Sequence, residues 1–267
     1  MTIQVHPSSV VEPGAQFDDG VVIGPFCHIG HQVKLARDVH LISHVSVQGD
    51  TCIGKGTKIY PFASIGHAPQ DLKYQNEPSR VDIGEHNTIR EHSSIHRGTR
   101  GGRMVTSMGD NNLVMGDVHI AHDCEIANHV IIVQSAGIAG HVFIDDHAIV
   151  GGMSGIHQFV RVGKHAMIGQ GSMVVNDVLP YTTVMGTRAC LGGTNVVGMK
   201  RHGYNRDEIH AIRQALDTLF TDSRHFGDAL AALQSSENHH SQTVAELLTF
   251  IGAGDSRRRY TGPGDAG

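Results

Sequence analysis

Apolar residues recur at every sixth position over most of the first 174 residues of this 267-residue chain. An α-helix has a period of 3.6 residues and a β-strand a period of 2, so neither produces this step over such a distance. The pattern predicts a hexapeptide solenoid, in which each hexad supplies a short strand, a turn and one branched residue that points inward. The positions, in three runs, are Val5, Val11, Phe17, Ile23, Ile29, Leu35, Leu41, Val47, Ile53, Ile59 and Ile65; Ile83, Ile89 and Ile95; and Val114, Ile120, Ile126, Ile132, Ile138, Ile144, Val150, Ile156, Val162, Ile168 and Val174.

Three hexads make one triangular coil of 18 residues, so each inward residue is expected to lie on the one 18 positions later. A prism this narrow has room for Ile and Val but hardly for Trp, in agreement with 5% aromatic residues and no tryptophan. Glycine is frequent, at 33 residues, and often follows the apolar residue, where we expect a turn to need a permissive backbone. These glycines are Gly24, Gly30, Gly54, Gly66, Gly84, Gly109, Gly151, Gly163 and Gly169.

The breaks in the repeat define the domain organisation. Two polar, glycine-containing stretches, residues 66–80 and 97–109, are expected to be insertion loops, and loops on a rigid scaffold commonly carry function. We therefore predict a parallel β-helix over residues 1–190 and a helical domain over residues 191–267. The composition of residues 253–267 favours a disordered tail.

Helical periodicity replaces the hexads from about residue 195. Asn205, followed three positions later by Glu208, has the pattern of a helix N-cap. Apolar residues then form one stripe along the predicted helix. Two further amphipathic stretches lie near residues 226–234 and 243–252. The fold class is therefore an all-β solenoid with an added α-helical part.

Composition limits the function classes. A net charge of −5 gives no overall signal for nucleic acid or another polyanion. The first residues lack the basic and apolar segments of a signal peptide, and no stretch approaches 18 consecutive apolar residues. The four cysteines are scattered and read as reduced thiols of a cytoplasmic protein. They are Cys27, Cys52, Cys124 and Cys190.

Residues 118–124 read VHIAHDC and place two histidines and an aspartate close together. With 21 histidines in the chain, any single one is expected to be structural. The 18-residue coil changes this expectation, because positions 140 and 158 then stack over His122. His141 and His157 stand beside those positions, so the three histidines form a column within reach of one ligand, with His119 on the neighbouring stretch.

The residues of this column suit acyl transfer. An imidazole such as that of His122 can take a proton from a hydroxyl as it attacks a carbonyl. A carboxylate at the other ring nitrogen, which Asp123 could supply, would hold the tautomer and stabilise the imidazolium. Asp123 could instead be only a turn residue that bonds to backbone amides. Gly140, one coil later, could present its N–H to a developing oxyanion.

Several segments, in order along the chain, resemble the UDP-N-acetylglucosamine O-acyltransferase family of lipid A synthesis. They are ASIGHAPQDLKY, IHRGT, HIAHDC, AGHV, GGMSGIHQFV and GMKRHGYNRDEI, and the resemblance covers about residues 1–220. It implies a left-handed β-helix that transfers an (R)-3-hydroxyacyl chain from acyl carrier protein to the sugar 3-position. It also implies a homotrimer with sites between subunits, no metal, and no cofactor beyond the phosphopantetheine of the carrier protein.

The resemblance implies roles for individual residues. On it, His122 is the general base, Asp123 its partner and Gly140 the oxyanion donor. The positions that match substrate contacts or support binding are Asp71, Lys73, His119, His141, His157, Gln158, Asn195 and Arg201.

Three positions depart from the family pattern. Val197 stands where better-known members carry an acidic nucleotide contact, and His202 stands where a second arginine is frequent. Gln170 stands where members that select long chains have glycine. In the related enzymes the acyl chain lies in a groove between neighbouring β-helices, so Gln170 predicts a medium-chain donor. The other interpretation of Gln170 is an exposed turn residue.

Three alternative functions stay open at this point. The sister N-acyltransferase of the same pathway carries an added N-terminal uridine-binding domain, for which hexads beginning at Val5 leave no room. A γ-class carbonic anhydrase would bind zinc with three histidines of such coils, although QDLKY and the C-terminal helices argue against it. A purely structural solenoid would need neither the histidine column nor two inserted loops.

Overall fold

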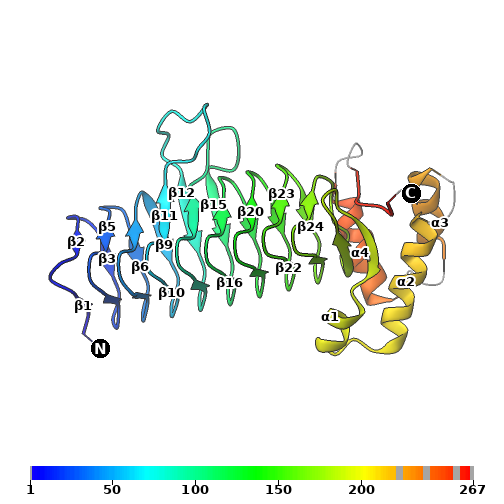
Figure 1. The fold of residues 1–267 in the computed structure, drawn as a ribbon, viewed down its shortest axis with the longest axis horizontal. Coiled ribbons are helices and arrows are strands. Elements are labelled where there is room, and N and C mark those ends of the chain that lie inside the picture. Colours follow the sequence, from blue (N-terminus) through cyan, green and yellow to red (C-terminus); the bar gives the residue numbers. More distant parts are fainter. Residues whose placement is uncertain (1, 221–224, 237–240, 255–258, 265–267) are drawn as a thin grey trace.

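The computed structural model describes residues 2–220, 225–236, 241–254 and 259–264. Within these ranges a long three-sided coil is followed by helices that gather at one of its ends (Figure 1). Strands on each side pair in parallel with the strand of the next coil, and Ile120, Ile138 and Ile156 are in register at intervals of 18 residues. The predicted hexapeptide solenoid is therefore confirmed.

The described strands form three sheets, one on each side of the coil. The first sheet contains β1 (Gln4–Val5), β4 (Val22–Ile23), β7 (His40–Leu41), β10 (Lys58–Ile59), β13 (Thr88–Ile89), β16 (Leu113–Val114), β19 (Ile131–Ile132), β22 (Ile149–Val150), β25 (Met167–Ile168), β27 (Thr182–Met185) and β28 (Cys190–Thr194). The second contains β2 (Val10–Val11), β5 (His28–Ile29), β8 (Ser46–Val47), β11 (Ser64–His67), β14 (Ser94–His96), β17 (His119–Ile120), β20 (Gly137–Ile138), β23 (Gly155–Ile156) and β26 (Met173–Val174). The third contains β3 (Gln16–Phe17), β6 (Lys34–Leu35), β9 (Asp50–Ile53), β12 (Arg80–Ile83), β15 (Val105–Met108), β18 (Glu125–Ile126), β21 (Phe143–Ile144) and β24 (Arg161–Val162).

The core of the coil is a column of aliphatic side chains. The hexad residues from Ile23 onward are buried, whereas Val5 is 43% exposed because the first coil has a neighbour on one side only. A second inward position lies two residues before each hexad residue and takes small side chains. Cys27 and Cys124 occupy it, and burial raises the pKa of the Cys124 thiol to about 12. These thiols are therefore packing residues.

The corners of the coil correct our expectation for glycine. The left-handed backbone conformation falls on the third residue after most inward residues, as at Phe26 with φ of 58° and His141 with φ of 61°. Of the nine glycines expected to supply the turn, only Gly66 has a positive φ among those recorded. The others are needed for close approach between coils. A Cβ at Gly24 would collide with the carbonyl oxygen of Ile42, and one at Gly151 would lie 2.6 Å from that of Ile168.

Histidine fills many of these left-handed corners, as a polar residue that tolerates this conformation. Within the described ranges, seven histidines have positive φ, and several stack on the corner residue one coil away. The ring centroids of His129 and His147 lie 4.8 Å apart, and those of His147 and His165 lie 4.7 Å apart. Part of the unusual histidine content is thus explained by stacking along the corners of the coil.

The two insertions project from the same side of the coil (Figure 1). The first lies between β11 and β12, over residues 68–79. The second is shorter than predicted: it covers residues 97–104, because residues 105–108 return to the coil as β15 and pair with β12. The loops are joined, since the backbone N–H of Arg100 donates to Glu77 Oε1 at 2.8 Å.

The helical part begins at the hairpin of β27 and β28, so the predicted boundary at residue 190 falls where β28 starts. The helices are α1 (Val196–Arg201), α2 (Arg206–Phe220), α3 (Phe226–Gln234) and α4 (Gln242–Gly252). The predicted cap of α2 is confirmed, because Asn205 Oδ1 accepts the backbone N–H of Glu208 at 2.9 Å. The Glu208 carboxylate reaches the start of α4 instead, where it accepts the Thr243 backbone N–H at 3.1 Å. No helix among the described residues is long and apolar enough to cross a membrane.

The predicted disordered tail is only partly within the described residues. Residues 255–258 and 265–267 lie outside them. Residues 259–264, for which disorder was expected, are instead paired with the end of the coil. Thr261 N–H donates to the Asp177 carbonyl at 2.8 Å, and Leu191 N–H donates to the Gly262 carbonyl at 2.7 Å. Backbone pairing therefore orders a segment whose composition alone favours disorder.

Candidate active site

His122 and Asp123 lie at a corner between β17 and β18. Asp123 occupies a left-handed position with φ of 59°, and its backbone N–H donates to Thr106 Oγ1 at 2.8 Å. Its carboxylate is fully buried beside the His122 imidazole, with Nδ1 of His122 2.9 Å from Oδ2 of Asp123. Asp123 is therefore both the turn residue and the histidine partner that the sequence offered as alternatives.

Hydrogen bonds fix the Asp123 carboxylate from the opposite side. Thr99 donates to it through its backbone N–H, at 3.0 and 3.1 Å, and through its hydroxyl, at 2.6 Å. Burial raises the pKa of the Asp123 carboxyl, but the hydrogen bonds from His122 and Thr99 lower it by more, so the net shift is downward. An ionised carboxylate at Nδ1 assigns the proton to that nitrogen and leaves Nε2 of His122 as the acceptor.

Two glycines hold the backbone close to this pair. A Cβ added at Gly140 would lie 2.6 Å from Cε1 and 2.7 Å from Nε2 of His122, so only glycine fits beside the imidazole. A Cβ added at Gly102, in the second insertion, would lie 2.5 Å from Asp123 Oδ2. The second insertion thus covers the buried carboxylate.

A cavity of about 540 Å³ lies in front of His122. It runs along the outer face of the second sheet, over β17, β20, β23 and β26, and Gln70 of the first insertion contributes to its wall. Its floor contains Gly137 and Gly155, which are in register on adjacent strands. The next residue in this row is Met173, whose Sδ would lie 2.8 Å from a Cβ at Gly155. The cavity is therefore mostly apolar, and Met173 stands at one end of its row of glycines.

Further histidines line the wall of the cavity near His122. The rings of His96 and His119 meet edge to face with centroids 4.8 Å apart, and His119 Nδ1 lies 2.8 Å from Ser94 Oγ. Burial lowers the pKa of both, that of His96 to about 4. Burial also lowers the pKa of His141, an effect that the charges of Asp123 and Asp71 only partly oppose. These neighbours are therefore neutral at pH 7.

The low pKa of His96 predicts a pH dependence of stability. The unfolded chain protonates this residue as pH falls through 6.5, whereas the folded protein resists protonation until about pH 4. The unfolded state then binds more protons, so the free energy of unfolding should fall between pH 6.5 and 4, by on the order of 3 kcal/mol from His96. Urea unfolding at pH 7, 5 and 4 measures this free energy, and it should change less with pH in His96→Gln than in the parent protein.

His86→Gln is the matched control, because His86 is an exposed corner histidine away from the cavity. Its free energy of unfolding should depend on pH as that of the parent protein does. The same pH dependence in His96→Gln as in the parent would show that other groups are responsible for it.

The structure brings some of the predicted site residues together and leaves others apart. His119, His122, Gly140, His157 and Gln158 line the cavity. His141 stands beside it, with its ring centroid 5.0 Å from that of His122. The predicted column of histidines is thus present. Lys73 is exposed on the first insertion, where its backbone N–H donates to Asp71 Oδ1 at 2.9 Å.

Other predicted or flagged positions lie outside the lining of this cavity. Gln170 and Arg201 are exposed, as is Val197. Asn195 caps α1, because its Oδ1 accepts the Gly198 N–H at 3.0 Å and its Nδ2 donates to the His165 carbonyl at 2.9 Å. A single chain therefore does not place these residues against His122.

The residues of the site that were missed include Thr99, Gly102 and Met173, as well as His96 and Gln70 of the cavity wall. Thr99 lies in the IHRGT segment and Gly102 follows it, but a loop outside the hexad register gives no spacing from which to place them. Met173 could have been found, because it stands 18 and 36 residues after two glycines of one row, Gly155 and Gly137.

The site and fold are similar to those of known proteins. Residues 177–261 match the family model described as UDP-N-acetylglucosamine O-acyltransferase, domain 2. The acyl-[acyl-carrier-protein]–UDP-N-acetylglucosamine O-acyltransferase of Thermodesulfovibrio yellowstonii is 46% identical over 250 residues, which cover 94% of this chain and 96% of that protein.

Solved structures agree along the whole length of the chain. A UDP-N-acetylglucosamine acyltransferase of Francisella novicida has a TM-score of 0.93 at 37% identity, covering 98% of this chain and 95% of its own. One of Bacteroides fragilis has a TM-score of 0.92 at 33% identity, covering 96% and 99%. The likeness confirms the left-handed parallel β-helix with C-terminal helices.

Proposed function

The chain belongs to the family of UDP-N-acetylglucosamine O-acyltransferases, and from this we propose that His122 is the general base of its reaction. The protein is an acyltransferase that moves an acyl group from acyl carrier protein to an oxygen of UDP-N-acetylglucosamine. The finer assignment is the transfer of an (R)-3-hydroxyacyl chain to the sugar 3-hydroxyl, at the start of lipid A synthesis.

One observation carries the mechanism: the buried Asp123 holds Nδ1 of His122, while His122 faces the cavity beside Gly140. Nε2 of His122 takes the proton of the sugar hydroxyl as its oxygen attacks the thioester carbonyl. The backbone N–H of Gly140 donates a hydrogen bond to the developing oxyanion. The intermediate then collapses, the C–S bond breaks, and the phosphopantetheine thiolate takes the proton from the imidazolium.

Asp123 acts on this reaction through His122. Its carboxylate keeps the productive tautomer and stabilises the imidazolium that forms in the transition state. Thr99 is a positioning residue, because it donates twice to the same carboxylate. Acyl transfer from sulfur to oxygen changes no oxidation state, so we propose that the phosphopantetheine of the carrier protein is the one prosthetic group that the reaction needs.

We propose that the acyl chain lies along the glycine row of the cavity and that Met173 limits its depth. A Cβ at Gly137 meets nothing within 4 Å, so this part of the floor is open, whereas the Met173 side chain lies over Gly155. A chain of medium length would end against this thioether. The hypothesis that Gln170 measures the chain stays a prediction, because Gln170 is exposed in the single chain.

Replacing Met173 by Gly is expected to shift donor preference toward longer chains. Each added methylene that gains apolar contact contributes about 0.8 kcal/mol, or roughly a fourfold change in relative rate. Competition between acyl carrier proteins loaded with 3-hydroxyacyl chains of different length measures this ratio. Gln170→Gly is the comparison. A shift of donor preference in that variant and none in Met173→Gly would show that Gln170, and not Met173, limits the chain length.

We propose a homotrimer in which the first insertion reaches a neighbouring subunit. Leu72 is fully exposed between Asp71 and Lys73, and the loop projects from the coil (Figure 1). An apolar side chain in such a loop favours burial against another chain. Residues that stand apart from His122 in one chain, such as Asn195 and Arg201, would then contact substrate from a neighbour. Sedimentation equilibrium would measure the assembly.

A cytoplasmic location is proposed from the cysteines. The structure has all four as free thiols, two of them buried. Reduced cysteines are typical of the cytoplasm. Acyl carrier protein and UDP-N-acetylglucosamine are the proposed partners there.

The alternatives open in the sequence are set aside by family membership. The Thermodesulfovibrio yellowstonii relative matches over 94% of the chain and is an O-acyltransferase by name, which disfavours the N-acyltransferase, the carbonic anhydrase and the purely structural solenoid. The decisive test is incubation with UDP-N-acetylglucosamine and a panel of acyl carrier proteins, followed by mass analysis of the product. A UDP-N-acetylglucosamine product bearing one ester-linked acyl group supports the proposal, and no transfer with any donor contradicts it.

A further inference from the structure

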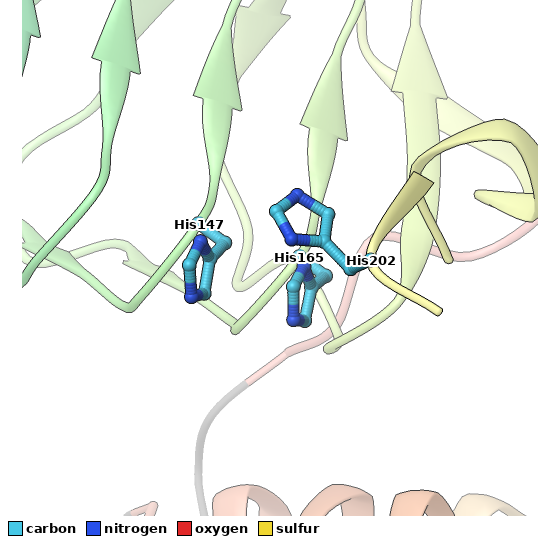
Figure 2. Close-up of side chains that lie close together, drawn as sticks. All are labelled: His147, His165 and His202. Atoms are coloured by element: carbon cyan, nitrogen blue, oxygen red, sulfur yellow. The ribbon is translucent and has the colours of Figure 1, made fainter. Parts of the chain in front are cut away.

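Three histidines that do not line the cavity of His122 lie close together (Figure 2). His147 and His165 are corner residues one coil apart, and His202 is the C-cap of α1. The ring centroid of His202 is 4.6 Å from that of each of the other two, and those two are 4.7 Å apart. The three rings therefore form a nearly equilateral group contributed by two coils and a helix.

The ring of His202 is oriented differently from the stack on which it lies. His147 and His165 are parallel within 2°, as are His129 and His147 within 4°. His202 is tilted by 57° and 58° to its two neighbours. Stacking along the corner explains His129, His147 and His165, but it does not explain a third imidazole placed equally close to two of them.

The nitrogens of these rings are available as ligands. One nitrogen from each ring lies within 4.8 Å of the others. In the part of the chain that the structure describes, no hydrogen bond is recorded for the ring nitrogens of His147, His165 or His202. Burial lowers the pKa of His147 and, to about 3, that of His165, so both are neutral at pH 7. Neutral imidazole is the form that binds metal ions and is poorly suited to hold an anion by charge.

We propose that His147, His165 and His202 together bind one divalent transition-metal ion of the zinc type. Three imidazole ligands with an open fourth position are a usual coordination of Zn²⁺. Bonds of about 2.1 Å require nitrogens no more than about 4.2 Å apart, so the rings must turn slightly toward one another. His202 is exposed and can make most of this adjustment, whereas His165 is 4% exposed and anchored.

Binding there would connect α1 to the coil. His202 ends α1, and Asn195 at the start of α1 already donates to the His165 carbonyl. An ion shared by His202 and the two corner histidines would add a second connection between the helical part and the β-helix. The three histidines lie outside the lining of the cavity that contains His122.

The test is titration of the full-length, untagged protein with Zn²⁺ after removal of metals by chelation. Isothermal titration calorimetry should show one tight site per chain. His202→Gln should weaken that site by at least about 100-fold, with the fold retained because His202 is exposed. Zn²⁺ should raise the melting temperature of the parent protein and leave that of His202→Gln unchanged.

His129→Gln is the matched control, because His129 belongs to the same stack and lies outside the group of three. It should bind Zn²⁺ as the parent does. Equal affinity in the parent and His202→Gln would overturn the proposal, as would an equal loss in His129→Gln. Loss of the tight site in His122→Gln would place the ion at the His122, Asp123 and His141 group instead, and would also overturn it.

Discussion

His122→Ala is expected to lower turnover by on the order of 10²–10⁴-fold, because it removes the base that accepts the sugar proton. The loss should appear in kcat more than in KM, since the proton moves only in the transition state. Steady-state rates with UDP-N-acetylglucosamine and a loaded acyl carrier protein measure it. The fold should persist, because the core of aliphatic side chains does not include His122.

The matched control is His129→Ala, which removes an exposed corner histidine far from the cavity lining. Its turnover and melting temperature should stay close to those of the parent. Near-normal turnover in His122→Ala would falsify the assignment of the base. A large drop in melting temperature of that variant would instead indicate a structural role for the imidazole.

Gly140→Ala is expected to lower turnover by about 100-fold although it adds only one methyl group. The added Cβ would lie 2.6 Å from Cε1 and 2.7 Å from Nε2 of His122, so the imidazole must move. A displacement of about 1 Å at a reacting group can cost this much, because alignment with the attacked carbonyl is lost. Gly140 is not among the residues with positive φ, so alanine can adopt its backbone conformation. Steady-state kinetics measures the loss of turnover, and thermal unfolding shows whether the added methyl group also destabilises the fold.

Gly137→Ala adds a methyl group on the same coil, where a Cβ meets nothing within 4 Å. It should leave His122 in place, so turnover with a short-chain donor should stay near that of the parent while longer donors are disfavoured. Equal turnover in Gly140→Ala and Gly137→Ala with the short donor would mean that the imidazole tolerates the methyl group. The proposed position of the base would then be wrong.

The sequence alone was sufficient to predict the coil and the centre of its active site. A six-residue step of aliphatic residues fits one inward position per strand, and no regular helix or flat sheet satisfies it. The same step makes residues 18 apart neighbours. His122, Gly140 and Gln158 could therefore be placed together before any coordinates were known, and the cavity contains all three.

The tertiary structure decided what lies outside the hexad register. Thr99 and Gly102 reach Asp123 from an insertion, and a loop has no period that predicts its contacts. Which residues adopt the left-handed conformation at the corners was also decided by the tertiary structure. Glycine directly after the inward residue was expected to supply the left-handed turn. Most of the left-handed corners, three residues after the inward residue, carry histidine, phenylalanine or aspartate, and most of the expected glycines stand where two coils approach closely.

The group of three histidines combines contacts that the repeat predicts with one that only the tertiary structure decides. The spacing of 18 residues between His147 and His165 follows from the repeat, and their stacking is a direct consequence of it. His202 is 37 residues further along and belongs to a helix that turns back on the coil. A repeat determines distances only among its own members, whereas the packing of a helix against it depends on side chains from both and on the chain between them.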